Sequence, residues 1–275
     1  MSSSSRRDVS RETRMTQNSP SERDQEPSAV LPAAPAAAAV VFGDRLGIAE
    51  HFAAILADTG VSHGLIGPRE VPRLWDRHVL NCAVAHEAFP EGASVIDVGS
   101  GAGLPGLALA VARPDLRLQL VEPMLRRTNW LTATVDALGL DNCTVHRGRA
   151  EDFRGTLTAP FATARAVARI DKLARWTFPL LEDGGVLVAL KGERATLELD
   201  EERAVLERLG MVASAIHTYG ATVLEVPTVT LELTIGLHVG GRSARGRSSQ
   251  RRGEVRAPKR GSRGSGPRPP RRTES

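Results

Sequence analysis

Cysteine is scarce in this 275-residue sequence, and long apolar runs are missing. The two cysteines, Cys82 and Cys143, lie inside a predicted helix and a predicted strand, and neither belongs to a C-x-x-C pair. This pattern excludes a disulfide framework; we expect buried thiols in a reduced, cytoplasmic protein, and we propose no metal site. The first apolar stretch, residues 29–42, is short and interrupted by Pro32 and Pro35, so we interpret it as a stiff linker. We expect no membrane association.

Charge is divided unevenly along the chain. The net charge of +4 conceals twelve arginine and lysine residues against two glutamates in residues 240–275, a net +10, which leaves −6 for the remainder. The same segment consists mostly of Gly, Ser, Pro and Arg, so we expect a disordered basic tail that attracts phosphate backbones by releasing counterions. A tail that only improves solubility explains this composition equally well.

The order of polar and apolar segments divides the chain into parts. Residues 1–28 are rich in Ser, Arg and Glu and have few apolar side chains, so they cannot bury enough surface to become ordered. We predict a disordered extension over residues 1–40, a helical cap over 41–91, an α/β core over 92–239 and a disordered basic tail over 240–275, with cap and core forming one domain, 41–239.

A glycine-rich turn follows the first predicted strand. The segment Asp97–Gly106 reads D-V-G-S-G-A-G-L-P-G, with β-forming residues before it and an Ala/Leu-rich helical segment, residues 107–113, after it. Glycine is needed there because only a residue without Cβ takes the left-handed angles of so tight a turn and lets a ligand approach the backbone. The pattern predicts a ligand site with free backbone N–H groups at the start of a helix.

Two classes of ligand use such a turn. The glycines of Gly101–Gly106 fit G-x-G-x-x-G, the pattern that binds NAD, and Glu122 follows near the distance of a ribose-binding acid. Asp97, two residues before Gly99, favours the other class, because a carboxylate at the end of the strand repels a pyrophosphate and suits a cation. S-adenosylmethionine carries a sulfonium and an ammonium and has no phosphate. A turn that binds nothing is the least favoured interpretation, since its glycines cost chain entropy.

Alternating strand and helix patterns continue after the turn. Residues 117–122 end before Pro123, which places Glu122 at the carboxyl end of the second strand, where it can accept the hydroxyl hydrogens of a ribose. After a third strand at 143–146, Glu151 can reach an adenine amino group, and the Ala150 backbone can bond the ring nitrogen. Further strands are predicted at 161–165, 185–190, 212–217 and 228–235, and helices at 46–56, 71–89, 125–138, 170–181 and 194–209.

Five βα units with a final β-pair are typical of the class I S-adenosylmethionine-dependent methyltransferases. These are α/β proteins with a Rossmann-like, doubly wound sheet, which is mostly parallel and has a final antiparallel strand. From about Leu65 to Gly236 the chain also resembles the small-subunit ribosomal RNA guanine-N7 methyltransferases, the family first called glucose-inhibited division protein B. The resemblance rests on Asp97–Gly106, Val121-Glu122-Pro123 with Arg126-Arg127, Arg149-Ala150-Glu151, and Thr163-Ala164-Arg165-Ala166-Val167-Ala168. Phe161-Ala162 stands where the family often has Phe-Asp, and Glu122 replaces a common Asp, a chemically mild change.

The resemblance implies a function and a set of cofactor-binding residues. Those implied to contact S-adenosylmethionine are Gly99, Leu104, Ala150, Glu151 and Arg165, to which the turn and strand patterns add Asp97, Gly101 and Glu122. The implied reaction methylates N7 of a guanine in small-subunit (16S) ribosomal RNA, free or within the small ribosomal subunit, and we expect a monomer. Guanine N7 is already a lone-pair acceptor, so the reaction needs alignment but no base. This explains the lack of an N/D-P-P-Y/F motif, and we name no catalytic residue.

Two other functions remain open at this point. An NAD-dependent oxidoreductase would use the same turn, although Asp97 and the lack of a hydride-transfer constellation disfavour it. A non-catalytic RNA-binding protein with a methyltransferase-like fold is favoured only by the basic tail. For any function on RNA, we expect contacts at a basic rim formed by Arg73, Arg77, Arg126 and Arg127.

Overall fold

The structure, a computed structural model, describes residues 30–165 and 168–237. Of the extension predicted to be disordered over residues 1–40, residues 1–29 lie outside the described residues, as does the predicted basic tail. Within the described part, the helices and strands form one compact unit, and no helix there is long and apolar enough to span a membrane.

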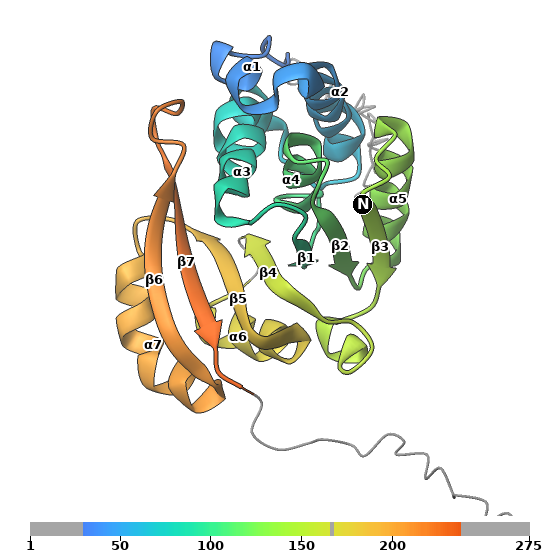
Figure 1. Cartoon of the computed structure of the whole chain (residues 1–275). Coiled ribbons are helices and arrows are strands. Elements are labelled where there is room, and N and C mark those ends of the chain that lie inside the picture. Colours follow the sequence, from blue (N-terminus) through green and yellow to red (C-terminus); the bar gives the residue numbers. More distant parts are fainter. Residues whose placement is uncertain (1–29, 166–167, 238–275) are drawn as a thin grey trace, which may run out of the picture. The chain divides into compact units, whose positions relative to one another are not determined.

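A seven-stranded sheet organises this unit, with the strand order β3-β2-β1-β4-β5-β7-β6 (Figure 1). The strands are β1 Ser94–Val98, β2 Arg117–Glu122, β3 Cys143–Arg147, β4 Ala159–Arg165, β5 Leu181–Lys191, β6 Met211–Tyr219 and β7 Thr228–Ile235. Neighbouring strands from β3 to β5 pair in parallel, and β7 is antiparallel to both β5 and β6. The predicted mostly parallel sheet with a final antiparallel strand is confirmed. Because the strand order reverses beside β1, a ligand crevice is expected at the carboxyl ends of β1 and its neighbours.

Helices cover both faces of the sheet. The α-helices are α1 Ala36–Phe42, α2 Leu46–Ile55, α3 Asn81–Ala83, α4 Gly106–Ala112, α5 Leu125–Leu138, α6 Ile170–Thr177 and α7 Ala195–Leu209. Shorter helical turns are η1 Gly43–Arg45, η2 Leu56–Gly60, η3 Pro68–Arg73, η4 Trp75–Leu80, η5 Val84–Ala88, η6 Ala150–Phe153 and η7 Phe178–Leu180. Val95 on β1 packs in one cluster with α1 to α5, whereas its neighbour Ile96 packs on the other face with Leu180 of η7. This alternation along β1 is what a strand buried on both sides requires.

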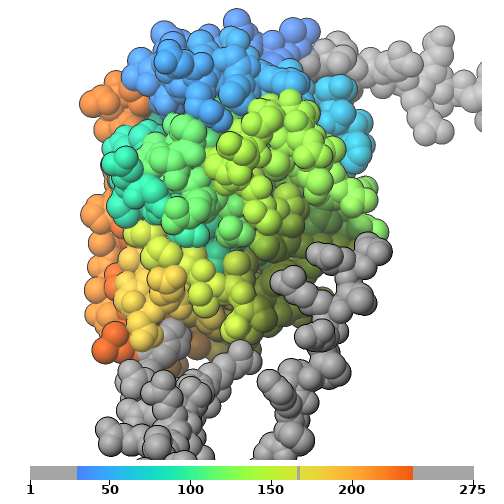
Figure 2. Space-filling view, turned by 45° about the vertical axis from the view of Figure 1, so that its right-hand side comes forward, coloured from blue at the N-terminus to red at the C-terminus, as the bar shows by residue number. Residues whose placement is uncertain are grey.

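The linker prediction for residues 29–42 is wrong at its end. Residues 36–42 form α1, and Ala38 and Phe42, four positions apart on one helix face, are buried in the main cluster. The two prolines precede the helix, with Pro35 at its N-cap, so they do not interrupt it. The boundary predicted at residue 40 therefore falls inside a helix. Figure 2 shows the first helices of the cap, in blue, packed directly on the green segments that follow β1.

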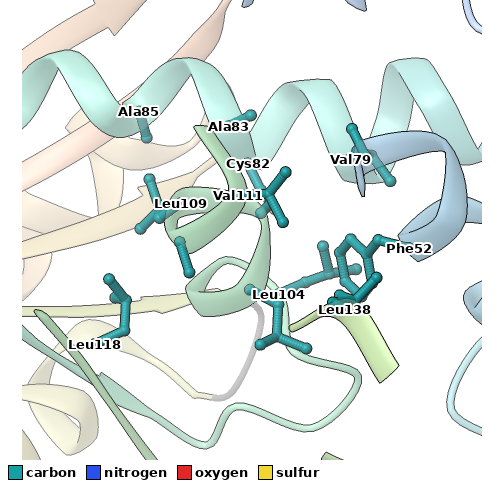
Figure 3. Packing of buried hydrophobic residues seen from close by; sticks show 14 of the residues in the cluster. Phe52, Val79, Cys82, Ala83, Ala85, Leu104, Leu109, Val111, Leu118 and Leu138 are labelled. Carbon is teal, nitrogen blue, oxygen red and sulfur yellow. The ribbon is translucent and has the colours of Figure 1, made fainter. Parts of the chain in front are cut away.

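The main cluster joins the cap to the core. Phe52 of α2, Val79 of η4 and Leu109 of α4 are all fully buried in it, together with Leu118 of β2 (Figure 3). Of the two cysteines, Cys82 is fully buried, and Cys143 on the edge strand β3 is partly buried against the main cluster, where burial raises the pKa of its thiol. The prediction of buried thiols is therefore confirmed for Cys82 and in part for Cys143.

Candidate functional site

The glycine turn between β1 and α4 needs glycine for two separate reasons. Gly99, Gly101 and Gly103 have φ angles of 76°, 53° and 75°, a left-handed region in which a residue with a Cβ is strained. Gly106 is needed for close approach, because a Cβ there would lie 2.6 Å from the Asp97 carboxylate oxygen Oδ2. The sequence-based argument for glycine therefore holds at these four positions.

Most backbone N–H groups of the turn have partners within the protein. Gly101 donates to Glu122 Oε2 over 3.1 Å, and Gly106 donates to Asp97 Oδ2 over 3.1 Å. Backbone carbonyls accept the N–H groups of Gly99, Ser100, Gly103 and Leu104. The prediction of free N–H groups is wrong for these six, because the two acids and nearby carbonyls accept their hydrogens.

Asp97 is buried behind the turn, with only 1% of its surface exposed. Its Oδ2 accepts the Gly106 hydrogen, whereas Oδ1 has no hydrogen-bond partner among the described residues. Burial is the largest influence and raises the pKa of the Asp97 carboxyl to about 7, against partial opposition from nearby donors and Arg165. This carboxyl group is therefore poised to change charge near neutral pH when a cation or hydrogen-bond donor arrives.

Glu122, at the end of β2, ties two loops together. Its Oε2 accepts from the Gly101 N–H, and its Oε1 accepts from the Met124 N–H over 2.9 Å. The Arg127 guanidinium lies 3.7 Å from Oε2, and the glutamate side chain is 2% exposed. Each carboxylate oxygen has two lone pairs, so each can accept one more hydrogen bond from a ligand. The carboxylate therefore bonds the glycine turn and the loop after β2 at the same time.

A cavity of about 730 Å³ opens beside these two loops at the carboxyl ends of β1 and β2. Its lining comes from the strand ends, the loops after them, η6 and α6: Val98, Gly99, Val121, Glu122, Pro123, Met124, Arg127, Gly148, Arg149, Ala150, Glu151, Lys172 and Trp176. Four of the eight predicted cofactor residues are brought together here, namely Gly99, Glu122, Ala150 and Glu151. The crevice predicted from the strand order is thus present.

The other four predicted residues do not line the cavity. Asp97 and Gly101 lie next to it and shape the turn through the bonds described above. Leu104 is 5% exposed and belongs to the buried cluster that Figure 3 shows. Its side chain therefore supports the turn from the core side.

Arg165, at the end of β4, is held by the helical cap. Its Nη1 donates to the Arg77 carbonyl over 3.0 Å, and its Nη2 lies 2.7 Å from His78 Nδ1. The other ring nitrogen of His78 lies 2.8 Å from Glu70 Oε2. Sequence reasoning placed Arg165 at a strand end but could not supply partners that lie almost ninety positions earlier in the chain.

Lys172 and Trp176 line the cavity and were missed by the sequence analysis. They lie four residues apart on α6, on the same helix face, and the Lys172 ammonium lies 5.0 Å from the centre of the Trp176 ring. The available signal was a polar and an aromatic residue at i, i+4 in the first helix after β4. An aromatic face at the cavity provides a surface for a planar ring.

The predicted basic rim divides into two pairs. Arg73 and Arg77 are exposed on η3 and η4, and Arg77 pairs with Glu70 over 3.3 Å. On α5, Arg127 lines the main cavity, and Arg126 lines a second groove beside η2. One pair thus flanks the Arg165 side of the sheet, and the other flanks Glu122.

Fold and site together define a class of protein. The strand order, the glycine turn after β1 and the acid ending β2 are those of the class I S-adenosylmethionine-dependent methyltransferases.

Comparison with known proteins identifies the family within this class. Residues 45–226 match the family model described as rRNA small subunit methyltransferase G. The chain is 52% identical over 219 residues to the ribosomal RNA small subunit methyltransferase G of Thermobifida fusca, an alignment that covers 79% of this chain and 92% of that one. Identity to the proteins of the same name is 50% in Streptomyces coelicolor (82% and 99% covered) and 49% in Mycolicibacterium smegmatis (82% and 97% covered). The chain therefore belongs to the ribosomal RNA small subunit methyltransferase G family.

Proposed function

We propose that the protein transfers the methyl group of S-adenosylmethionine to N7 of a guanine in small-subunit ribosomal RNA. The observation that carries the proposal is an identity of about half, over almost the whole length, to relatives named ribosomal RNA small subunit methyltransferase G. An NAD-dependent oxidoreductase and a non-catalytic RNA-binding protein both lack this support. The N7 position comes from the resemblance, and the lack of an N/D-P-P-Y/F motif in the sequence agrees with it.

The cavity suits S-adenosylmethionine by its donor and acceptor groups. Glu122 keeps two lone-pair sites for the hydroxyls of a ribose, and Glu151 with the Ala150 backbone suits an adenine edge. Asp97 Oδ1 has no hydrogen-bond partner among the described residues, and the carboxyl group ionises near neutral pH. A ligand with a cationic amino-acid part would therefore favour the ionised carboxylate beside the turn. Gly99 lines the cavity without a side chain, so a ligand can approach its backbone.

The reaction requires the protein mainly to align the guanine N7 with the methyl group of the cofactor. The bound cofactor supplies an electrophilic methyl group, the guanine N7 lone pair forms the new N–C bond, and the electron pair of the broken S–C bond stays on sulfur. No proton leaves, so no general base is required. The chain's own contribution is to hold the cofactor by the two loops that Glu122 joins, exclude water, and bind RNA phosphates through the exposed arginines of the rim.

The direct test is methyl transfer from radiolabelled S-adenosylmethionine to small-subunit ribosomal RNA, offered both as naked RNA and as assembled small subunits lacking the modification. We expect label in one guanine, located by borohydride reduction and aniline cleavage, which cut at N7-methylguanine. A matched reaction with large-subunit RNA should remain unlabelled. Label in a base that resists aniline cleavage would contradict the N7 assignment, and absence of label on every substrate would contradict the function.

Two finer expectations belong to the same proposal. The protein acts as a monomer in the cytoplasm, where ribosomal subunits are made, and no part of the described chain offers a membrane-spanning helix. Light scattering of the purified full-length protein tests the monomer, and a dimer mass at assay concentration would overturn it.

A further inference from the structure

The helical cap holds Arg165, one of the expected cofactor contacts, through two contacts at the end of β4. We propose that His78 is a positioning residue, which in its neutral form with the proton on Nε2 holds the Arg165 guanidinium at the carboxyl end of β4. This inference rests on the proposed function and deepens it, because it names what orients one of the expected cofactor contacts.

The hydrogen-bond geometry determines the tautomer of His78. A guanidinium has only donors, so the 2.7 Å contact between Arg165 Nη2 and His78 Nδ1 requires a lone pair on Nδ1. The ring proton is therefore on Nε2, which donates to Glu70 Oε2 over 2.8 Å. Glu70 thereby fixes the ring, and the ring in turn fixes Arg165.

The surroundings keep His78 neutral. Its side chain is 15% exposed, and burial lowers its pKa below the ordinary value of 6.5. Three charged groups face it: Glu70 on η3 raises its pKa, whereas Arg165 on β4 and Arg77 on its own turn η4 lower it. The lowering influences prevail, so the lone pair on Nδ1 is present at neutral pH.

Acid should release Arg165. When His78 gains a second proton, Nδ1 becomes a donor facing a guanidinium 2.7 Å away, and two positive charges replace a hydrogen bond. Of these two contacts with the cap, Arg165 then keeps the one from Nη1 to the Arg77 carbonyl. Protonation of His78 should therefore lower cofactor affinity by at most about tenfold per pH unit below its pKa. Asp97 also titrates near neutral pH, but its contribution is common to wild type and to the variants compared below.

The first experiment reads the tautomer directly. Nitrogen-15 NMR of the full-length protein with labelled histidine should give His78 one protonated nitrogen, Nε2, and one unprotonated nitrogen, Nδ1, at pH 7.5. A His78→Gln spectrum assigns the signals. A proton on Nδ1, or an imidazolium at this pH, would overturn the proposal whether or not the protein methylates RNA.

The second experiment measures the affinity for S-adenosylhomocysteine by calorimetry at a series of pH values. Its acid limb is the pH range in which this affinity falls as the solution becomes more acidic. Removing the Glu70 charge by Glu70→Gln lowers the pKa of His78 further, so the limb should move to lower pH. Arg77→Gln removes a nearby cation but leaves the backbone carbonyl, so the limb should move to higher pH. His51→Gln, a change at an exposed histidine on α2, should leave it in place.

The acid limb should thus shift to lower pH in Glu70→Gln and to higher pH in Arg77→Gln. A general loss of stability would not shift it in opposite directions in the two variants, so the pair distinguishes positioning from destabilisation. A limb that stays fixed in both variants, or moves the same way in both, overturns the role of His78. If S-adenosylhomocysteine does not bind at any pH, the proposed function fails, and the NMR result still decides the tautomer.

Discussion

Replacing Asp97 by Asn should stabilise the protein at neutral pH and remove part of its pH dependence. The carboxyl is 1% exposed, one of its oxygens has no partner in the described residues, and its pKa is raised to about 7 by burial. Asparagine has nearly the same shape, and its side-chain oxygen can still accept the Gly106 N–H. It carries no charge that burial could penalise.

The sign and size follow from proton binding. The folded protein holds the Asp97 proton more tightly than the unfolded chain, where the ordinary pKa is 3.8. This contribution to stability is therefore fully present below about pH 4 and is lost as the pH rises to about 7. A difference of about three pKa units corresponds to at most about 4 kcal/mol, lost at about 1.4 kcal/mol per pH unit.

The assay is urea unfolding of wild type and Asp97→Asn at several pH values from 4.5 to 8, followed by tryptophan fluorescence. Other titrating groups are common to both proteins, so the difference between the two unfolding free energies isolates Asp97. We expect that difference to change in favour of the variant as the pH rises, and to level off above pH 7. A difference that is constant over the whole range would show that Asp97 is ionised in the folded protein and refute the reasoning.

Four further changes test the remaining parts of the site. Gly99→Val should abolish S-adenosylmethionine binding in calorimetry, and retained affinity would contradict the role of the turn. Because φ is 76° at this position, the variant should also lose about 1 kcal/mol of unfolding free energy while its unfolding stays cooperative. Glu122→Gln should weaken cofactor binding by about 1–3 kcal/mol and lower the melting temperature, since its amide group would face one of two N–H donors; unchanged binding would remove Glu122 from the site. Arg165→Ala should raise the apparent dissociation constant for the cofactor. A change confined to RNA affinity would instead show that this arginine contacts the RNA. Deleting residues 240–275 should leave cofactor affinity unchanged but lower RNA affinity and flatten its dependence on salt, measured at two or more salt concentrations; an unchanged salt slope would make the tail a solubility device.

Strands with clear local signals were predicted from the sequence to the residue. The bounds 117–122 and 228–235 agree with β2 and β7, because alternation and a following Pro123 or Gly236 mark their ends. Helix α5 also ends as predicted, with Gly139 in the left-handed conformation. Where local pattern and tertiary packing agree, periodicity is sufficient.

The failures occur where composition and packing disagree, or where partners are distant in the sequence. The Ala/Pro stretch looked like a linker, but alanine is a strong helix former, and Phe42 gives α1 a side chain to bury. Two N–H groups expected to be free at the turn donate to Glu122 and Asp97 instead. The contact with Glu122 exists because β2 lies beside β1 in the sheet, which the sequence does not show directly. The same limit explains why the link from His78 to Arg165 had no sequence signal.

Glu122 also constrains how this site can change over evolutionary time. Its two oxygens accept hydrogen bonds from N–H groups on two different loops, so the residue expected to bind the ligand also holds together the two loops that line the cavity. An aspartate, one methylene shorter, would have to give up one of these bonds unless the loops moved together, so the exchange that looked mild in the sequence is not a local one here. Relatives with aspartate at this position should therefore also differ in both loops, and a change of ligand preference here would require compensating substitutions in them.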